Sequence, residues 1–258
     1  MAIKYSQAPI SEVTCGIFFK SSILANGAIF FELLAQLKTD YPSILTSPTS
    51  AEEEVISGSI HANPNYERAG FAAYRFATSD NRWQVVVQQN MFSFHWVRQD
   101  AEAVGNYPGF AEIYRKFRLL LDTVKKYIGG DSSFFNSIKA CYLAYLDRIE
   151  MRPFTERGEN IKNILTLTPP GFSVNGRQYF ANNYFARYST PCEEVDGYSI
   201  MSINSPTLPF GQILIVDNKI KGHPSSIDKV DEWFDVAHGI QLSFFESTFT
   251  PQTLQYWR

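Results

Sequence analysis

Cysteine is scarce in this sequence, and its three copies are widely spaced. Cys15, Cys141 and Cys192 form no CxxC pair, so the sequence indicates neither a zinc knuckle nor a thioredoxin-like redox site. An odd, sparse set of cysteines is typical of reduced thiols, and no apolar run is long enough for a signal peptide or a membrane span. We therefore expect a cytoplasmic protein without membrane association.

An excess of basic charge is also lacking. The chain has 23 Lys and Arg against 26 Asp and Glu, with a formal net charge of −3. A sequence-independent nucleic-acid binder uses Lys and Arg to neutralise phosphates and usually has a basic balance. The composition disfavours nucleic acid as a partner, but it leaves open a basic patch assembled by folding.

Motifs of the common enzyme classes are absent. The glycines match neither GxGxxG nor GxxxxGKS/T, and the chain contains no GxSxG, HExxH, HxH or HxxxH pattern. We therefore predict no metal and no cofactor. An enzyme becomes the less favoured class, although an unfamiliar active site would not be detected in this way.

Apolar and aromatic residues, by contrast, are abundant. They make up 45% and 15% of the 258 residues, and a chain of this length can bury a substantial core without disulfides or metals. Such a composition argues against disorder. The Phe and Tyr residues fall mostly in short alternating runs, which is typical of strands that bury rings on one face.

The order of predicted elements repeats along the chain. The first pass contains a strand, a helix, three strands and a long amphipathic helix, at residues 10–19, 28–37, 72–78, 83–89, 91–98 and 110–127. The second pass contains a strand that is apolar on both faces, a short helix, three strands and an amphipathic helix, at residues 138–149, 160–167, 178–188, 198–204, 212–218 and 230–245.

This order predicts an α+β fold. We expect two similar halves, residues 1–130 and 131–258, which form one body around a shared antiparallel sheet of at least eight strands with helices on one face. TATA-binding-protein-like and helix-grip-like folds have the same element order, an analogy without functional content. Residues 43–67 carry prolines, serines and an acidic run, which predicts an exposed loop.

Several stretches together resemble a known protein family. They are PISEV at residues 9–13, FSFHW at 92–96, YPGF at 107–110, CYLAY at 141–145, and the terminal His238, Phe245 and Trp257-Arg258. The family is a sporadically distributed prokaryotic one of unknown function, with proteins of about this length. This chain departs from it after the Phe-His pair, where it reads Trp96-Val97-Arg98. The resemblance implies no activity, cofactor or catalytic residue, and the family's patchy distribution implies mobile defence or toxin–antitoxin loci.

His95 is the most tempting single residue, because the pKa of histidine lies near neutrality and suits a base or a metal ligand. A catalytic histidine needs an orienting carboxylate, for which Asp147 is the candidate, and a metal needs three or four ligands. His61, His223 and His238 show no ligand spacing. We therefore interpret His95 as a hydrogen-bonded structural residue, and His238 in the same way.

The end of the strand at residues 138–149 carries a second group of candidates, Tyr145, Asp147, Arg148 and Arg152. A carboxylate paired with arginines can form a binding pocket or a polar network. Exposure at an edge and ordinary ion pairing explain these residues as well, and we favour that interpretation. Arg148 and Arg152 share a face if the strand runs that far, which would make an anion site.

A third group interleaves aromatic residues with arginines and includes Arg177, Tyr179 and Arg187. Such mixtures can stack single-stranded bases while the guanidinium groups follow the backbone. A strand whose one face packs against a helix has the same composition.

The sequence favours a non-enzymatic module that binds a protein partner, with homo-oligomerisation left open. The first alternative is a nucleic-acid or nucleotide binder that uses the sheet surface around Arg148, Tyr179 and Arg187. The second alternative is an enzyme with an unfamiliar site centred on His95.

Overall fold

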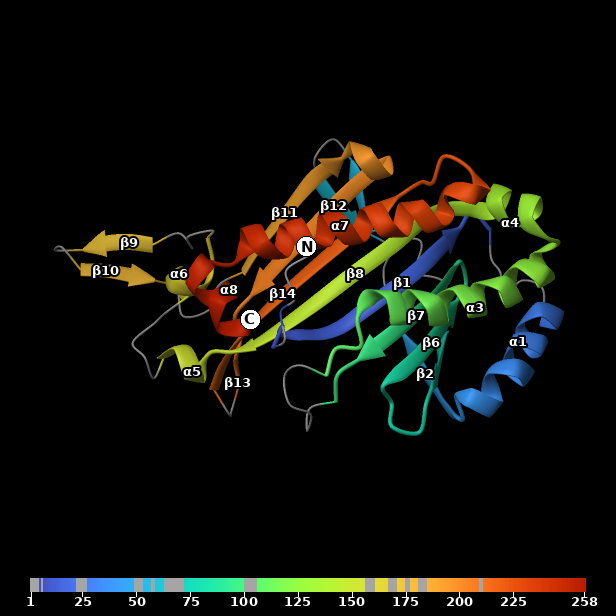
Figure 1. The fold of residues 1–258 in the computed structure, drawn as a ribbon, viewed down its shortest axis with the longest axis horizontal. Coiled ribbons are helices and arrows are strands. Elements are labelled where there is room, and N and C mark those ends of the chain that lie inside the picture. Colours follow the sequence, from blue (N-terminus) through green and yellow to red (C-terminus); the bar gives the residue numbers. More distant parts are fainter. Residues whose placement is uncertain are drawn as a thin grey trace.

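One antiparallel sheet organises the molecule (Figure 1). The computed structural model describes residues 5, 7–21, 27–48, 53–56, 59–62, 72–99, 106–155, 161–166, 171–174, 177–180, 185–208 and 211–258. The sheet order is β11 (Phe185–Cys192), β12 (Gly197–Asn204), β14 (Gly211–Gly222), β8 (Ile138–Glu150), β1 (Ile10–Phe19), β7 (Met91–Val97), β6 (Trp83–Gln88), β5 (Ala72–Ala77) and β2 (Ser43–Pro48), with β13 (Thr207–Leu208) pairing β14.

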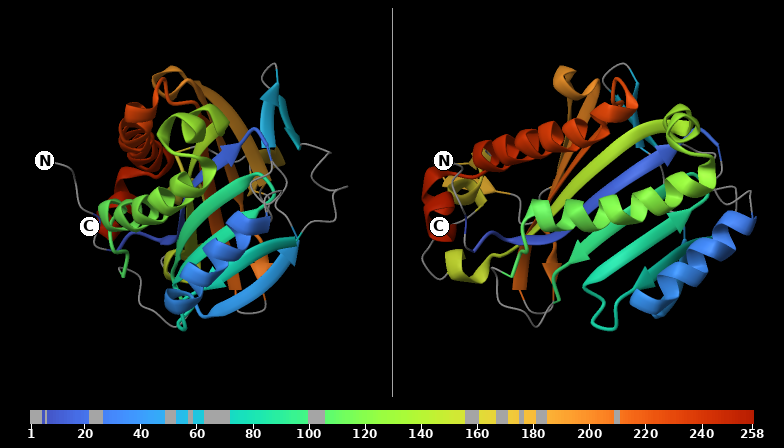
Figure 2. Two further views of the ribbon diagram at one scale, coloured as in Figure 1. Left: turned by 90° about the vertical axis from the view of Figure 1, so that its right-hand side faces the viewer. Right: turned by 45° about the vertical axis from the view of Figure 1, so that its right-hand side comes forward.

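The three long helices lie on one face of this sheet (Figure 2). They are α1 (Gly27–Asp40), α3 (Phe110–Ile128) and α7 (Val230–Thr248). The shorter elements are α4 (Asp131–Ser137), α5 (Arg152–Thr155), α6 (Ile161–Ile164), α8 (Pro251–Trp257), and the strand pairs β3 (Glu53–Ile56) with β4 (Ser59–Ala62) and β9 (Gly171–Val174) with β10 (Arg177–Phe180). The predicted α+β class, the large antiparallel sheet and the placement of the helices are thus confirmed.

The pairing of β1 with β8 forms the middle of the sheet. Strands β7, β6, β5 and β2 continue the sheet from β1, whereas β14, β12 and β11 continue it from β8. The two predicted halves of the chain therefore occupy opposite sides of this central pairing.

Alternation along the central strands separates the two faces of the sheet. On β1, Val13, Cys15 and Ile17 are fully buried against the helices, and on β8 Cys141 and Leu143 are buried in the same core. Successive side chains of a strand point to opposite faces, so the residues between them project from the face opposite the helices. We call that second face the open face.

A β-bulge at Ser11 changes the phase of this alternation. Ile10 pairs with Asp147 and Glu12 pairs with Leu146, so β1 carries one extra residue, and Ser11 Oγ donates to the Leu146 carbonyl oxygen at 2.9 Å. Bulges re-aim the side chains that follow or precede them. As a result, Ile10 lies on the helix face beside Asp147 while Glu12 lies on the open face.

Aromatic side chains join α3 to α7. Phe234 is fully buried, and its ring centroid lies 5.4 Å from that of Phe117 and 5.0 Å from that of Tyr114. Further along, the His238 ring stacks on Phe110, the first residue of α3, at 4.1 Å. Helix α7 continues past this point, so its C-terminal half lies over the sheet beyond the start of α3 (Figure 1).

The predicted loop at residues 43–67 is wrong where the structure describes it. Residues 43–48 form the edge strand β2, and β3 and β4 lie in the same stretch, whose remaining residues are outside the described part. Ile44, Leu45 and Thr46 are all exposed, so β2 lacks the alternation by which half-buried strands are recognised. The strand predicted at residues 178–188 is instead divided between β10 and β11.

Two further properties concern the whole described chain. No described helix is both long and apolar enough to cross a membrane. The three cysteines are free and buried, and burial raises the pKa of the Cys15 and Cys141 thiols well above the ordinary value. These thiols are therefore not set up as nucleophiles.

Candidate functional site

A cavity of about 650 Å³ lies under the C-terminal half of α7. Its floor is formed by β8, β14 and β12, and its remaining walls are formed by the N-terminal segment and by residues 107–110, which lead into α3. Gly109 has a φ of 94°, a conformation that favours glycine, at the turn into α3. The lining residues are mostly apolar or aromatic: Ala8, Ile10, Pro108, Phe110, Met201, Val216, Leu242, Phe244, Phe245 and Phe249.

Asp147 is the acidic residue of this cavity. It is only 6% exposed, and no described group makes a hydrogen bond to its Oδ1 atom. Burial raises the pKa of this carboxyl to about 7; the charge of Asp217 adds to the increase, whereas the charge of Arg98 opposes it. Buried polar atoms are nearly always hydrogen-bonded, so this carboxyl is an exception, and the part of the side chain that is exposed lines the cavity, where a ligand group can reach it.

Three hydrogen-bonding side chains stand next to Asp147. The Tyr145 hydroxyl lies 3.1 Å from the Tyr107 hydroxyl and 3.0 Å from His238 Nδ1. Burial lowers the pKa of His238 to about 4, so the ring is neutral at pH 7, and its Nδ1 shares a hydrogen bond with the Tyr145 hydroxyl. Burial also raises the pKa of Tyr145 well above its ordinary value, so both groups are uncharged.

A fully paired network ties α7 to the cavity floor. Ser199 Oγ donates to Asn218 Oδ1 at 2.6 Å, and Asn218 Nδ2 donates to Gln241 Oε1 at 2.8 Å. Gln241 Nε2 in turn donates to the Asn218 carbonyl oxygen at 2.9 Å and to the Leu143 carbonyl oxygen at 3.3 Å. Because the side-chain amides of Asn218 and Gln241 are already hydrogen-bonded, they hold α7 over the cavity and are not the groups expected to bind a ligand.

The arrangement allows two kinds of chemistry. A carboxyl group whose pKa lies near 7 can exchange a proton with a bound molecule at neutral pH. It can also bind a hydrogen-bond donor or a cation in a place from which water is largely excluded. The neutral chain from Tyr107 through Tyr145 to His238 orients donors and acceptors without adding charge.

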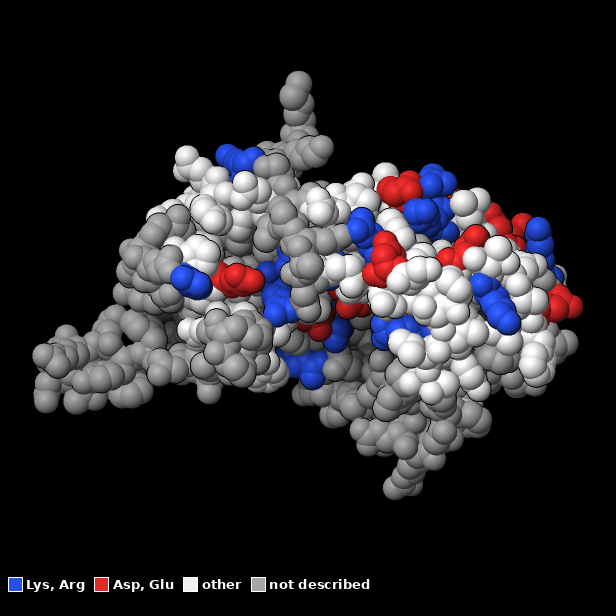
Figure 3. Space-filling model, turned by 90° about the horizontal axis from the view of Figure 1, so that it is seen from below, with Lys and Arg blue, Asp and Glu red and all other residues white. Residues whose placement is uncertain are grey.

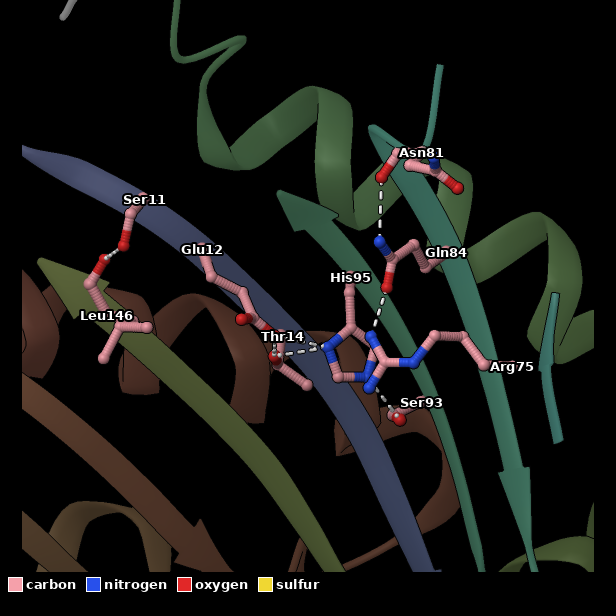
Figure 4. A network of polar contacts seen from close by, with 9 residues as sticks. All are labelled: Ser11, Glu12, Thr14, Arg75, Asn81, Gln84, Ser93, His95 and Leu146. Carbon is pink, nitrogen blue, oxygen red and sulfur yellow. Dashed lines mark hydrogen bonds and ion pairs between the residues drawn. The ribbon is translucent and has the colours of Figure 1, made fainter. Parts of the chain in front are cut away.

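His95 lies on the open face, in a chain of polar contacts (Figure 4). Its Nδ1 donates to Glu12 Oε1 at 2.7 Å, and its Nε2 lies 2.8 Å from Ser93 Oγ. Burial raises the pKa of Glu12, but the hydrogen bond from His95 and the charge of Arg75 outweigh it, so the pKa lies below its ordinary value. The order of groups resembles a Ser-His-acid triad.

Accessibility argues against catalysis by this chain. Ser93 has no exposed surface, so no substrate atom can approach its Oγ. Both ring nitrogens of His95 already have partners, which supports the structural interpretation. The predicted pairing of His95 with Asp147 is wrong, because the two side chains lie on opposite faces of the sheet and line different hollows.

The predicted anion site requires Arg148 and Arg152 to share one face of a strand. Strand β8 ends at Glu150 and Arg152 begins α5, so Arg148 and Arg152 do not share a strand face and the proposed anion site is not formed. Successive side chains of β8 point to opposite faces. Arg148 follows Asp147 and therefore projects from the open face, as Leu146 does. Asp147 is not at an exposed edge in an ordinary ion pair, as favoured above, but buried on the other face.

The nucleic-acid hypothesis stays a prediction. Arg187 is exposed and pairs with Ser202, whose neighbour Asp217 lies on the open face, whereas the side chains of Arg177 and Tyr179 are outside the described part. On the described surface in Figure 3, Lys and Arg are interspersed with Asp and Glu rather than gathered into one basic field. No three His, Cys, Asp or Glu side chains gather among the described residues in a way that could hold a metal ion.

Sequence reasoning found part of this site. Tyr145 and Asp147 were candidates, and the structure brings them to one cavity. His238 was set aside as structural, and Tyr107 and Gln241 were not considered. The one available signal was the position of Asp147 on the apolar face of its strand, with Leu143 and Ile149, where a solvated carboxylate is not expected.

Comparisons with known proteins give little further guidance. No family model matches the chain, and a search of curated proteins finds no significant match. Among solved structures, the chain is similar to a crystal structure of the di-domain ARO/CYC BexL from a biosynthetic pathway, at 13% identity over 90% of this chain and 96% of that chain. The TM-score is 0.21, which is too low for the likeness to carry an argument.

Proposed function

We propose that the protein binds a small, largely apolar molecule in the cavity under α7. The observation that supports this proposal is the unpartnered Oδ1 of Asp147 at the wall of an otherwise apolar space of about 650 Å³. Binding sites for small molecules are typically clefts of roughly 300–1,000 Å³ with apolar walls and a few convergent polar groups. The cavity has this size and this composition.

The buried carboxyl group of Asp147 also destabilises the fold, which favours a functional origin for this cavity. Leaving a carboxyl group buried without a partner destabilises a protein. A chain that can satisfy Asn218 and Gln241 in the same neighbourhood could satisfy or replace Asp147 as well. Sites that break a local packing rule without an evident structural gain are commonly functional.

A larger side chain at the entrance of the cavity should weaken the binding of a small molecule. Leu242 lines the cavity and is 39% exposed, so it stands at the rim. Leu242→Trp should weaken the binding of Nile red, an uncharged apolar dye, by about tenfold or more. The matched control is Ser243→Trp, at an exposed position of the same helix that does not line the cavity. Fluorescence titration gives the affinity and the stoichiometry.

Saturable binding of one dye per chain that Leu242→Trp removes and Ser243→Trp preserves is the expected result. A parent protein that does not bind the dye, or equal affinities in both tryptophan variants, would contradict the proposal.

A protein partner, the function that the sequence favours, is a second candidate. It is supported by apolar side chains on the two outermost strands, Leu45 of β2 at 56% exposure and Phe185 of β11 at 67%. Edge strands with exposed apolar residues are suited to pairing with another chain. That this protein is encoded in a mobile defence or toxin–antitoxin locus is a hypothesis that rests on the family resemblance alone.

Edge substitutions test this second candidate. Tagged parent protein should retain a near-stoichiometric protein from its native host, and the double variant Leu45→Ser, Phe185→Ser should lose it. Leu119→Ser, at an exposed leucine of α3 away from both edges, is the control. Equal recovery by all three proteins, measured by mass spectrometry, would count against a partner at the sheet edges.

A further inference from the structure

We infer that the molecule bound under α7 is an organic cation, an apolar body whose ammonium group contacts the Asp147 carboxylate. This inference rests on the proposed binding function and specifies the class of ligand. Three separate features of the cavity wall support it.

The first feature is the sign of the available charge. Neither Lys nor Arg is among the described residues that line the cavity, and its histidine, His238, is neutral. Asp147 is therefore the one lining group that carries charge at neutral pH. A fatty acid or another anionic amphiphile would place its charge against this carboxylate with no cationic side chain among the described lining residues, which is unfavourable in a buried site.

The second feature is the position of the acceptor. Asp147 Oδ1 is buried and receives no hydrogen bond from the described residues. The side chain as a whole is 6% exposed and lines the cavity, and an ionised carboxylate can only accept hydrogen bonds, so a ligand group that reaches it must be a donor. A charged N–H donor gives the shorter and stronger bond.

The third feature is the number of aromatic rings that line the cavity with Asp147. Tyr5, Tyr107, Phe110, Tyr145, Phe244, Phe245 and Phe249 all line the cavity. The negative faces of such rings attract organic ammonium groups, and aromatic cages are a recurring solution for binding them. Aromatic rings alone would suit any apolar ligand, but together with a single carboxylate they favour a cation.

The titratable groups that line the cavity with Asp147 come from several elements. They are Tyr5 from the N-terminal segment, Tyr107 from the segment before α3, Tyr145 from β8 itself and His238 from α7. Arg98, which follows β7, and Asp217 of β14 act on it through their charges. Arg98 is not among the residues that line the cavity, so it does not occupy the position of the ligand.

Two probes of the same shape test the inference. Octylamine and octanol share one apolar chain and differ in a charged against a neutral head group. Calorimetric titration at pH 8 should give an affinity for octylamine that is about tenfold or more above that for octanol. In Asp147→Asn, which keeps the shape of the side chain, this preference should disappear.

A pH series adds a readout that packing alone would not change. Below pH 7 the carboxyl group is increasingly protonated, so octylamine affinity should fall by about fiftyfold between pH 7 and pH 5. Octanol affinity should stay nearly constant, and so should octylamine affinity in Asp147→Asn.

Each outcome separates the inference from the function beneath it. Equal binding of octanol and octylamine, or tighter binding of octanoate, overturns the cation while leaving an apolar binding site intact. Failure of all probes, Nile red included, overturns both. A preference for octylamine that survives in Asp147→Asn would place the cation elsewhere and overturn the role of this carboxylate.

Discussion

Replacing Asp147 with Asn should raise the free energy of unfolding at pH 8 by on the order of 4 kcal/mol. Burial holds the pKa of this carboxyl at about 7 in the folded protein, against an ordinary value of 3.8. A difference of one in pKa between two states is worth about 1.4 kcal/mol of stability. Asn keeps the shape of the side chain and removes its ionisation.

The direction in which the free energy of unfolding changes with pH follows from the raised pKa of Asp147. Below pH 4 the carboxyl is protonated in both states and costs nothing through ionisation. Between about pH 4 and pH 7 the unfolded chain releases the proton while the folded chain retains it, so the free energy of unfolding of the parent falls. Above pH 7 the loss is complete and constant. Urea denaturation of parent and Asp147→Asn from pH 4 to pH 8 should therefore give curves that diverge as the pH rises.

Asp235→Asn provides the baseline. Asp235 is an exposed carboxylate of α7, so this variant reports what the loss of one negative charge does by itself. A constant difference between parent and Asp147→Asn over the whole range would show that Asp147 ionises as a solvated carboxylate. In that case the cavity would be wetter or its carboxyl better paired than the geometry indicates.

Phe234→Ala should lower the free energy of unfolding by about 3–5 kcal/mol. The side chain is fully buried at the crossing of α7 with α3, where it contacts Tyr114, Phe117 and Trp233. Truncation removes the burial of a large ring and leaves a cavity that rigid aromatic neighbours cannot fill. Urea denaturation at constant pH measures the loss.

A surface phenylalanine gives the matched control. Phe31 of α1 is 67% exposed, and Phe31→Ala should change the free energy of unfolding by no more than about 0.5 kcal/mol. A cost below about 1 kcal/mol for Phe234→Ala would mean that α3 and α7 do not meet through this residue. The affinity for Nile red should be retained in the variant, because Phe234 is not among the residues that line the cavity.

The order of elements is accessible to sequence reasoning because burial imposes a period on the chain. Strand β1 and helix α3 each bury one face, so their apolar residues recur at two and at three or four positions, and the predicted bounds agree with the observed ones within a residue or two. Strand β2 has no such period, because its side chains are exposed on both faces. Its pairing with β5 is decided by backbone hydrogen bonds, which leave no trace in side-chain type.

Only part of the candidate site can be predicted from the sequence. A period of two places Asp147 on the apolar face of β8 and Arg148 on the other, so the ion pairing that the sequence analysis favours does not join these two neighbours. The cavity depends instead on where α3 begins along α7 and on the bulge at Ser11, which turns Ile10 toward Asp147. Such tertiary offsets have no local signature, and this is why His238 looked like an ordinary helix residue.

The position of β1 in the sheet has a consequence for how the chain is made. This strand is synthesised before its two neighbours, β7 and β8, which end at residues 97 and 150. Until both have been synthesised, β1 lacks the strands that flank it in the sheet, and its apolar side chains Val13, Cys15 and Ile17 lack part of the core in which they are buried. Contacts of such long sequence separation slow folding and leave apolar surface open to aggregation. A nascent chain that stalls before residue 138 would leave the β8 side of β1 as an unpaired strand edge, open to pairing with another chain.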